Sequence, residues 1–574
     1  MTAFEQSGGI AGRAPAPPPQ RIEALDVVRG FALIGICLMN IEFFNRPVAT
    51  LGQGMPAGLA GIDWLAAYFV AYFVEGKFWT IFSLLFGMGF AVTVTRAENA
   101  GRSFLEPYLR RIAALAVFGA IHHIFLFAGD ILFSYAVAAL FLLVVLYGKW
   151  KWLLAALAVA AGLACVPGLG QAAGGVAATL ALSSLIGLYM RNEKRSLSLS
   201  LSPVALILLL AGASGALGAA AMWTLKLGPA ETRWPLSACS AVLLLISFLA
   251  NRYRDPVEAR SWRAGAATYL LLTTLATIGG AVDYFAPPEP VTPGAVSGSA
   301  TAAAKADVNK SAATPTVTEK STDAERKATR VAERAKRLKE RAEEAVIESR
   351  VMRSGSYLDL VKLRARDFAR QVPDQSGFAA LLIGMFLLGA GLIRTGVLQN
   401  SSVHRPLLRK LATIGLAVGI GMGVLGSLIA TTHVPGALHD GFGFANGLLM
   451  MGNLPACLGY VSAIVLLLHS RSRFAKVRVL APFGRMALTN YLSQSLLMSS
   501  IFLGYGLGYW GLGRAAQLLV ALALCGVQIA ASHWWLARFR YGPAEWLWRA
   551  VTYLKMPPMR IAPTRTPLQA RPGG

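Results

Sequence analysis

Long apolar runs separated by short polar loops make up most of this chain. An apolar helix of roughly 20 residues crosses the hydrocarbon core of a bilayer, so each run predicts a membrane span. The pattern therefore predicts an all-α, polytopic membrane protein with about fourteen transmembrane helices. The runs cover residues 25–44, 63–95, 109–128, 130–148, 152–168, 174–190, 203–225, 234–250, 262–285, 377–393, 411–430, 444–468, 480–504 and 515–536.

Arginine and lysine gather in alternate loops of this pattern. The intervening loops near 129, 170, 228, 435 and 508 carry few positive charges. The loops rich in Arg or Lys are 96–111, 149–151, 191–195, 252–263, 394–410, 471–478 and 538–549. This asymmetry is typical of the positive-inside rule, under which cytoplasmic loops hold the excess of basic residues. Because Arg13 and Arg21 precede the first span, both termini are predicted to be cytoplasmic.

Composition agrees with the membrane class. The 574 residues are 55% hydrophobic and 14% charged, as in polytopic membrane proteins. A net charge of +25 would otherwise suggest nucleic acid, but the positive charges lie in short loops between apolar runs. We therefore expect the lipid bilayer as a partner and no nucleic acid. The five cysteines fall in or beside apolar runs without CxxC spacing, so we interpret them as small core residues.

One polar interval, 287–374, interrupts the apolar runs, and the parity of the spans places it outside the cytoplasm. It begins with a low-complexity linker and continues as a predicted charged helix near 322–350, where Thr322 and Glu325 are spaced as a capping box. Small apolar residues recur in that helix with heptad spacing. A coiled-coil partner site and a solvated single helix both fit. We favour the solvated helix, because an Ala-rich seam buries little area.

These features divide the chain into six parts. Residues 1–20 form a Pro-, Gly- and Ala-rich tail without the apolar region of a signal peptide, so we expect the first apolar run to be retained. The predicted parts are a disordered cytoplasmic tail (1–20), an N-terminal membrane core (21–148), additional transmembrane helices (149–286), the extracytoplasmic linker and charged helix (287–374), a C-terminal membrane domain (375–555) and a second disordered cytoplasmic tail (556–574).

Polar residues inside the first apolar run point to an internal cavity. Asp26 and Arg29 lie three residues apart, so they share a helix face and can pair. Polar groups in a membrane helix are costly unless they are paired, and they usually face the bundle interior. Two interpretations fit. Either Arg29 anchors the helix start at lipid headgroups, or Arg29 and Asn40, eleven residues apart on similar faces, line a cavity.

His122 and His123 lie toward the outer end of the third span, close to Asp130 across a tight turn. A carboxylate beside a histidine orients the ring and raises its basicity, as a general base requires. The loop at 433–440, with two more histidines and an aspartate, lies on the same predicted side. The alternative is an aqueous vestibule in which these side chains only meet water. Their spacing does not establish a metal site.

Glu75 and Lys77 interrupt the run at 63–95, which fits either one steeply tilted helix or a short surface helix followed by a span. An embedded Glu/Lys pair is costly and usually functional, but a helix break between the two would let both reach the interface. Further along the same run, Gly87 and Gly89 are interpreted as sites of close helix packing.

The segment 484–495, GRMALTNYLSQS, places polar side chains in and beside a span that enters from the predicted cytoplasmic side. Arg485, near the inner mouth, fits a site for phosphate or carboxylate and equally an anchor in anionic lipid. Asn490 and Gln494 are i, i+4 neighbours on this span. They fit either a binding site or hydrogen bonds that bridge two helices. The later segment RFRYGPAEWLWRAVTYLK predicts an amphipathic helix on the inner membrane surface.

Five motifs occur in a fixed order: LDVVRGFALIGICLMNI, GKFWTIFSLLFGMGF, HHIFLFAGDIL, GRMALTNYLSQS and GPAEWLWRAVTY. Together they resemble the YeiB-like family, a bacterial inner-membrane family known as domain of unknown function 418. The resemblance covers about 21–146 and 376–555, whereas 152–374 departs, with extra spans and a longer insert. It implies a multi-pass protein of the bacterial inner membrane.

The resemblance also implies a link to membrane acyltransferases, including the acyltransferase-3 and heparan-glucosaminide acetyltransferase-like proteins. These transfer an acyl group from cytoplasmic acyl-CoA to an acceptor on the other side. Two histidines of the acyltransferase-3 pattern are replaced here by Asn40 and Gln494. The acetyltransferase-like branch relies on a histidine in the following loop, and 45–62 contains none. The histidine that matches the YeiB-like pattern is His122, eight residues before Asp130.

The resulting hypothesis is a membrane acyltransferase in which His122, oriented by Asp130, is the base toward an external hydroxyl or amine acceptor, and Asn40 polarises a carbonyl. Acyl-CoA is the expected donor, with no metal. Two alternatives remain open: a transporter or flippase with an intramembrane polar path, and an envelope scaffold docked through the external insert. The predicted substrate- or donor-binding residues are Asp26, Arg29, Glu75, Lys77, Arg485, Asn490 and Gln494.

Overall fold

The computed structural model describes residues 22–50, 54–56, 58–101, 103–166, 169–191, 201–226, 230–285, 323–431, 441–470 and 472–561. Within these residues all regular secondary structure is helical, apart from one isolated bridge between Phe539 and Arg560. The predicted all-α fold class is therefore confirmed for the described part of the chain. The predicted linker, most of both predicted tails and the histidine loop at 433–440 lie outside it.

Twenty α-helices are described. In the first half they are α1 (Glu23–Asn40), α2 (Glu42–Asn45), α3 (Gly61–Phe69), α4 (Lys77–Asn99), α5 (Leu105–Phe125), α6 (Leu132–Tyr147), α7 (Trp150–Ala164), α8 (Gly170–Arg191), α9 (Pro203–Thr224), α10 (Ala230–Arg252) and α11 (Arg260–Phe285). In the second half they are α13 (Asp323–Ser354), α14 (Tyr357–Gln371), α15 (Gln375–Arg394), α16 (Arg405–Thr431), α17 (Phe442–Leu468), α18 (Leu480–Arg485), α19 (Ala487–Phe502), α20 (Arg514–Leu536) and α21 (Pro543–Tyr553).

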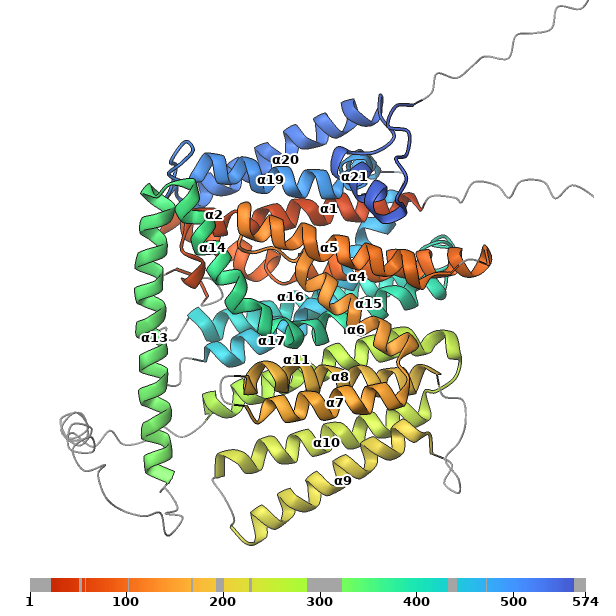
Figure 1. The fold of residues 1–574 in the computed structure, drawn as a ribbon, viewed down its shortest axis with the longest axis vertical. Coiled ribbons are helices and arrows are strands. Elements are labelled where there is room, and N and C mark those ends of the chain that lie inside the picture. Colours follow the sequence, from red (N-terminus) through yellow and green to blue (C-terminus); the bar gives the residue numbers. More distant parts are fainter. Residues whose placement is uncertain are drawn as a thin grey trace, which may run out of the picture.

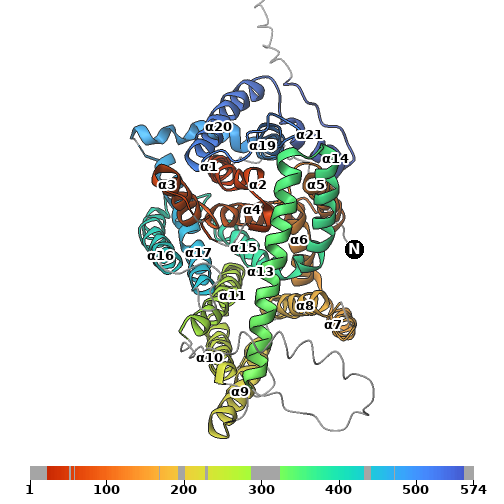
Figure 2. The same cartoon turned by 90° about the vertical axis from the view of Figure 1, so that its left-hand side faces the viewer.

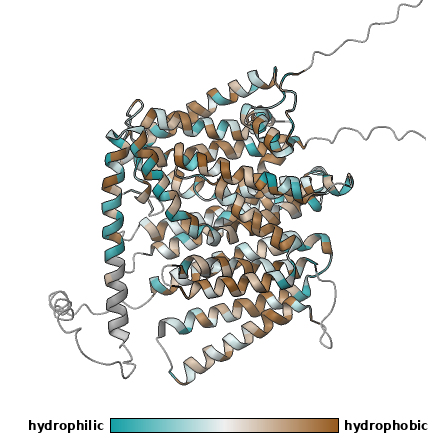
Figure 3. Ribbon diagram, in the orientation of Figure 1, coloured by the Kyte–Doolittle hydropathy of each residue, from teal (hydrophilic) through white to brown (hydrophobic). Residues whose placement is uncertain are grey.

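Most of these helices run side by side in one bundle, and α13 crosses their ends (Figure 1). Figure 2 looks onto the face that α13 crosses. Apolar residues are spread through all layers of the bundle, whereas α13 carries many hydrophilic ones (Figure 3). A bundle with apolar residues on its outside as well as its inside is expected for a protein solvated by lipid.

Ten helical segments of the described chain are long and apolar enough to cross a membrane, which indicates a multi-pass membrane protein. The predicted count of fourteen is not confirmed. The other four predicted spans fall on α5, α6, α7 and α19. The last three have only 16, 15 and 16 residues, and α5 carries charged residues in its first turns. The ten segments are Glu23–Asn45, Gly61–Asn99, Gly170–Arg191, Pro203–Thr224, Thr232–Arg252, Val257–Phe285, Tyr357–Arg394, Arg405–Thr431, Phe442–Leu468 and Arg514–Leu536.

The run at 63–95 forms two helices, so the interpretation of a short helix followed by a span is the one observed. The first, α3, ends in one turn of π-helix, η2 (Val70–Val74), and α4 begins after Gly76. Gly76 has a φ of 80°, which favours glycine. A Cβ atom at this position would also meet the side chain of Asn453 in α17.

The described part of the polar insert contains two α-helices, α13 and α14, which pack on the same end of the bundle. Glu348 of α13 accepts a hydrogen bond from the backbone N–H of Ala49 at 3.0 Å. In α14, the Tyr357 hydroxyl donates to the carbonyl of Phe125 at the end of α5, at 3.0 Å. The helix predicted near 322–350 corresponds to α13, and the proposed cap at Thr322 lies outside the described residues. Leu338, on the predicted seam, is exposed, which agrees with a solvated helix.

The centre of the bundle is the contact between α4 and α15, where two glycines let the backbones approach closely. A Cβ atom at Gly87 would overlap the backbone of Phe386, and one at Gly389 would overlap the carbonyl of Leu84. A Cβ atom at Gly89 would have no neighbouring atom within 4 Å, and this glycine lines a cavity instead. Close packing thus describes Gly87 but not Gly89.

We expect Gly87→Ala to destabilise the protein by about 1–3 kcal/mol, because the added methyl group forces α4 and α15 apart. Gly89→Ala is the matched control two residues away and should stabilise the protein by up to about 1 kcal/mol, because alanine favours the helix and meets no neighbouring atom there. Thermal unfolding of the purified variants in one detergent measures the difference. Equal unfolding temperatures for the two variants would contradict the observed α4–α15 contact.

Candidate functional site

Five arginines from different parts of the chain line one cavity of about 430 Å³. The cavity lies between α1, α4, α5, α21 and the α18–α19 segment, at the end of the bundle that the charge pattern predicts to be cytoplasmic. Glu545 is the one acidic residue in its described lining. The arginines are Arg29, Arg96, Arg111, Arg485 and Arg549. We call this space the arginine cavity.

Aromatic and acidic neighbours hold several of these arginines in place. Arg29 forms an ion pair with Asp26 one turn earlier in α1, at 3.2 Å, so the predicted pairing is present. Arg111 lies 5.6 Å from the ring centre of Phe86 and 6.0 Å from that of Trp548. Its Nε atom is buried and has no hydrogen-bond partner among the described residues. A guanidinium group held in this way is available to an anion in the cavity.

Glu545 does not neutralise the cavity, because its carboxylate is engaged with the start of α19. One oxygen accepts hydrogen bonds from the backbone N–H groups of Leu488 (2.6 Å) and Thr489 (3.2 Å), and the other accepts from the Thr489 hydroxyl (2.6 Å). Burial raises the pKa of Glu545. This contact fixes α21 as one wall of the cavity and supplies the negative charge that a helix N-terminus favours.

At the other end of the cavity, Tyr491 separates it from His122 and Asp130. His122 Nδ1 lies 2.8 Å from Asp130 Oδ1, and the two side chains are 1% and 0% exposed. The second oxygen of Asp130 accepts from the backbone N–H of Phe133 at 3.0 Å. Tyr491 lines the cavity, packs its ring 4.9 Å from that of His122 and points its hydroxyl at Asp130 Oδ1, 3.5 Å away.

The geometry distinguishes His122 from its neighbour. His122 Nε2 is buried and has no hydrogen-bond partner in the described chain, while its Nδ1 is held by Asp130. This is the arrangement in which a carboxylate orients a histidine and leaves the far nitrogen for a reacting group. His123 instead packs on Phe368 of α14, with ring centres 5.1 Å apart. The burial of His122 and Asp130 disagrees with the open-vestibule interpretation for this pair.

The other predicted site residues do not line the arginine cavity. Asn40 is buried at the last residue of α1. Asn490 donates to Ser532 Oγ at 3.0 Å, and Gln494 donates to Gln528 Oε1 at 2.9 Å. Both contacts join α19 to α20, as the helix-bridging interpretation expects.

Glu75 and Lys77 belong to a second polar cluster at the opposite end of α4. Glu75 lies within electrostatic range of Glu42, Arg46 and Lys77. Glu42 in turn pairs with Arg46, and with Arg514 at 3.2 Å. Lys77 is 1% exposed, and its Nζ has no hydrogen-bond partner in the part of the chain described. Arg29 and Arg485 thus line one cavity, whereas Glu75 and Lys77 lie apart from it.

Sequence reasoning missed Arg96, Arg111, Arg549 and Tyr491 as cavity residues. The positive-inside pattern accounts for Arg96 and Arg111 as charges of a basic loop. In the structure both lie within helices, Arg96 in α4 and Arg111 in α5. Tyr491 falls inside one of the five motifs, so the sequence marks its position but not its contact with His122.

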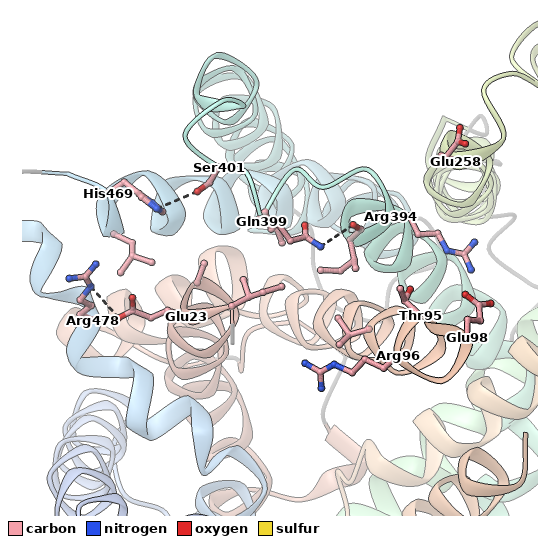
Figure 4. Close-up of a pocket in the computed structure, with 16 residues that line it drawn as sticks. Glu23, Thr95, Arg96, Glu98, Glu258, Arg394, Gln399, Ser401, His469 and Arg478 are labelled. Atoms are coloured by element: carbon pink, nitrogen blue, oxygen red, sulfur yellow. Dashed lines mark hydrogen bonds and ion pairs between the residues drawn. The ribbon is translucent and has the colours of Figure 1, made fainter. Parts of the chain in front are cut away.

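A second and larger space, of about 770 Å³, adjoins the arginine cavity, and Arg96 lines both. Figure 4 shows this space between α1, α4, α15 and α17, with the side chains of Arg96 and Glu98 leaving α4 in different directions. Two contacts border it: Glu23 with Arg478 at 3.1 Å, and Ser401 with His469 at 3.3 Å. Its lining is of mixed charge, unlike that of the arginine cavity.

Comparisons with known proteins return uncharacterised relatives. Residues 392–555 match the family described as "Protein of unknown function (DUF418)". The uncharacterised protein YxaH of Bacillus subtilis (strain 168) is 26% identical over 547 residues, which cover 94% of this chain and 96% of that protein. The uncharacterised protein YeiB of Escherichia coli (strain K12) is 33% identical over 175 residues, which cover 30% of this chain and 44% of that protein. No solved structure matches this chain with significance.

These findings bear on the family and not on the chemistry. The likeness to YxaH extends over nearly the whole chain, so it is not confined to the segments that carry the motifs. The relatives named here are bacterial. The DUF418 match over 392–555 and the similarity to YeiB agree with the resemblance to the YeiB-like family in these parts of the chain.

Proposed function

We propose that this protein is a membrane acyltransferase that takes an acyl group from a cytoplasmic acyl-CoA and passes it to an acceptor on the other side of the membrane. One observation carries the proposal. The arginine cavity, rich in positive charge, ends at Tyr491, which contacts a buried histidine–carboxylate pair. A site for an anionic donor and a candidate base are thus separated by a single side chain.

The donor class follows from the charge of the cavity. Five guanidinium groups and one engaged carboxylate favour a ligand with several negative charges, such as the phosphates of a coenzyme A thioester. The volume of about 430 Å³ suits part of such a donor, and its deep end has apolar walls from Ile131 and Leu132. In this proposal the phosphates lie at the arginines and the thioester lies toward Tyr491.

In the proposed reaction His122 Nε2 takes the proton from an acceptor hydroxyl or amine, and the acceptor atom attacks the thioester carbonyl. The carbon–sulfur bond then breaks, and the proton passes from His122 to the departing thiolate. Asp130 holds the imidazole in place and stabilises its charged form. Asn40 has no catalytic role in this reaction, and Glu75, Lys77, Asn490 and Gln494 make no contact with the donor.

The test is binding of acyl-CoA to the purified protein in lipid nanodiscs, measured by calorimetry or with a labelled ligand. We expect saturable binding that coenzyme A competes for, that neutral pantetheine does not, and that weakens as salt rises, because charge pairing dominates. Absence of acyl-CoA binding at low salt would overturn the proposal. Turnover is then measured as loss of the thioester in the presence of candidate acceptors.

A second candidate function, a small-molecule transporter, is favoured by the cluster around Glu75 and Lys77. Broken membrane helices and buried charges often mark substrate sites in transporters, and here α3 and α4 meet at a break beside a buried lysine. Uptake or efflux by proteoliposomes that contain no acyl donor would support this function over acyl transfer.

A further inference from the structure

The short helix α21 presents two faces with different surroundings. On one face, Glu545, Trp548 and Thr552 line the arginine cavity. On the other, Leu547 and Val551 are 45% and 40% exposed, and Leu554, which follows the last residue of the helix, is 68% exposed. Leu547 and Val551 lie one turn apart on this face, so they form an apolar stripe, and Leu554 follows it at the end of the helix. Figure 1 shows α21 nearly end-on while α19 and α20 run across the view, so α21 lies roughly perpendicular to these helices.

The chain around this stripe is basic on its exposed side. Between residues 537 and 561 the sole acidic residue is Glu545, and its carboxylate is turned inward onto α19. The outward-facing charges of the segment are therefore all positive. Apart from Arg549, which lines the arginine cavity, the basic residues of this segment are Arg538, Arg540, Lys555 and Arg560, and all four are exposed.

We propose that α21 docks on the inner leaflet of the membrane, with anionic phospholipid as its occupant. An apolar stripe between basic residues, on a helix perpendicular to the spans, is the geometry of an interfacial helix. Basic side chains near such a surface gain from its negative potential. Because the opposite face of α21 is a wall of the arginine cavity, docking also holds that wall in place. This second part rests on the proposed function.

The test places a fluorophore on the stripe of the full-length protein. Cys165 and Cys239 are replaced by serine, the three buried cysteines are kept, and a V551C substitution carries the label. The protein is studied in nanodiscs of phosphatidylcholine with and without phosphatidylglycerol. Quenching by nitroxide lipids reports insertion, and quenching by aqueous iodide reports exposure.

We expect nitroxide quenching in discs with phosphatidylglycerol. The triple variant R540Q/K555Q/R560Q should lower the ratio of docked to undocked helix on the order of a hundredfold. The control R405Q/R409Q/K410Q removes the same charge from the exposed start of α16 and should leave the quenching unchanged. The docking would be overturned if iodide quenched the label in both kinds of disc and nitroxide lipids did not. It would also be overturned if the label were protected from iodide only after an acidic protein was added.

The docking measurement uses no acyl donor, so its failure is distinct from failure of the proposed acyl transfer. The coupling to the cavity is tested separately, by acyl-CoA affinity in the two kinds of disc. Tighter binding with phosphatidylglycerol, lost in the triple variant and retained in the control, is the expected result. Equal affinity in both lipids despite observed docking would overturn the coupling.

Discussion

Replacing His122 with alanine is expected to reduce acyl transfer by about 10²–10⁴-fold while acyl-CoA still binds. The reason is the orientation of the ring. Asp130 holds Nδ1 at 2.8 Å, and Nε2 is left without a hydrogen-bond partner among the described residues. Loss of thioester in a nanodisc assay measures the transfer, and equilibrium binding measures the donor affinity. Asp130→Asn should give a smaller but still large loss, because the amide stabilises a charged imidazole poorly.

His123→Ala is the matched control for this experiment. His123 is the next residue of α5, is equally buried and packs on Phe368, and within the described chain its ring is not hydrogen-bonded to Asp130. The control therefore removes the same side-chain volume from the same helix. Comparable loss of transfer in the two histidine variants, with similar unfolding temperatures, would contradict the assignment of His122 as the base.

The second large effect is expected in the arginine cavity. Arg111→Met should weaken acyl-CoA binding roughly 10- to 150-fold, because a charge-assisted hydrogen bond contributes about 1.5–3 kcal/mol. Methionine keeps much of the side-chain packing between Phe86 and Trp548 and removes the charge. The loss should shrink at high salt, where the wild-type affinity also falls.

Arg110→Met provides the control. Arg110 precedes Arg111 in α5, but its side chain is 39% exposed and pairs with Glu106 one turn earlier. Both variants change the net charge by the same amount, so a general electrostatic effect on the anionic donor would weaken binding in both. Only a local site predicts a large effect for Arg111 and a small one for Arg110. Equal affinities for the two variants would argue against the cavity as the donor site.

Features that depend on local spacing could be predicted from the sequence. The positions of the helices follow from the apolar runs, because a membrane requires every backbone polar group to be satisfied within its own helix. The Asp26–Arg29 pair follows from a spacing of three on one helix face, and it is present at 3.2 Å. His122 and Asp130 are separated by eight residues and one tight turn, so their contact also required little tertiary information.

Other features were ambiguous because one residue type serves two purposes. An arginine at the end of a span satisfies the positive-inside rule whether it faces lipid headgroups or a cavity. Arg96 and Arg111 therefore resemble loop charges in the sequence, although they line the cavity with Arg29 and Arg485. In the same way, Asn490 and Gln494 fit either a ligand or a helix contact, and the position of α20 decided for the helix contact.

The sequence by itself determined that this is an all-helical, multi-pass chain with basic residues in alternate loops and two local polar pairs, because these properties depend on hydropathy and on neighbours within a few residues. Only the tertiary structure decided which polar groups share a space. It joined five arginines from distant segments at the arginine cavity, placed Tyr491 against His122, and set Glu75 and Lys77 apart. The physical reason is that convergence depends on how helices pack and cross, and the close contacts that set this packing, such as Gly87 against Phe386, join residues far apart in the chain.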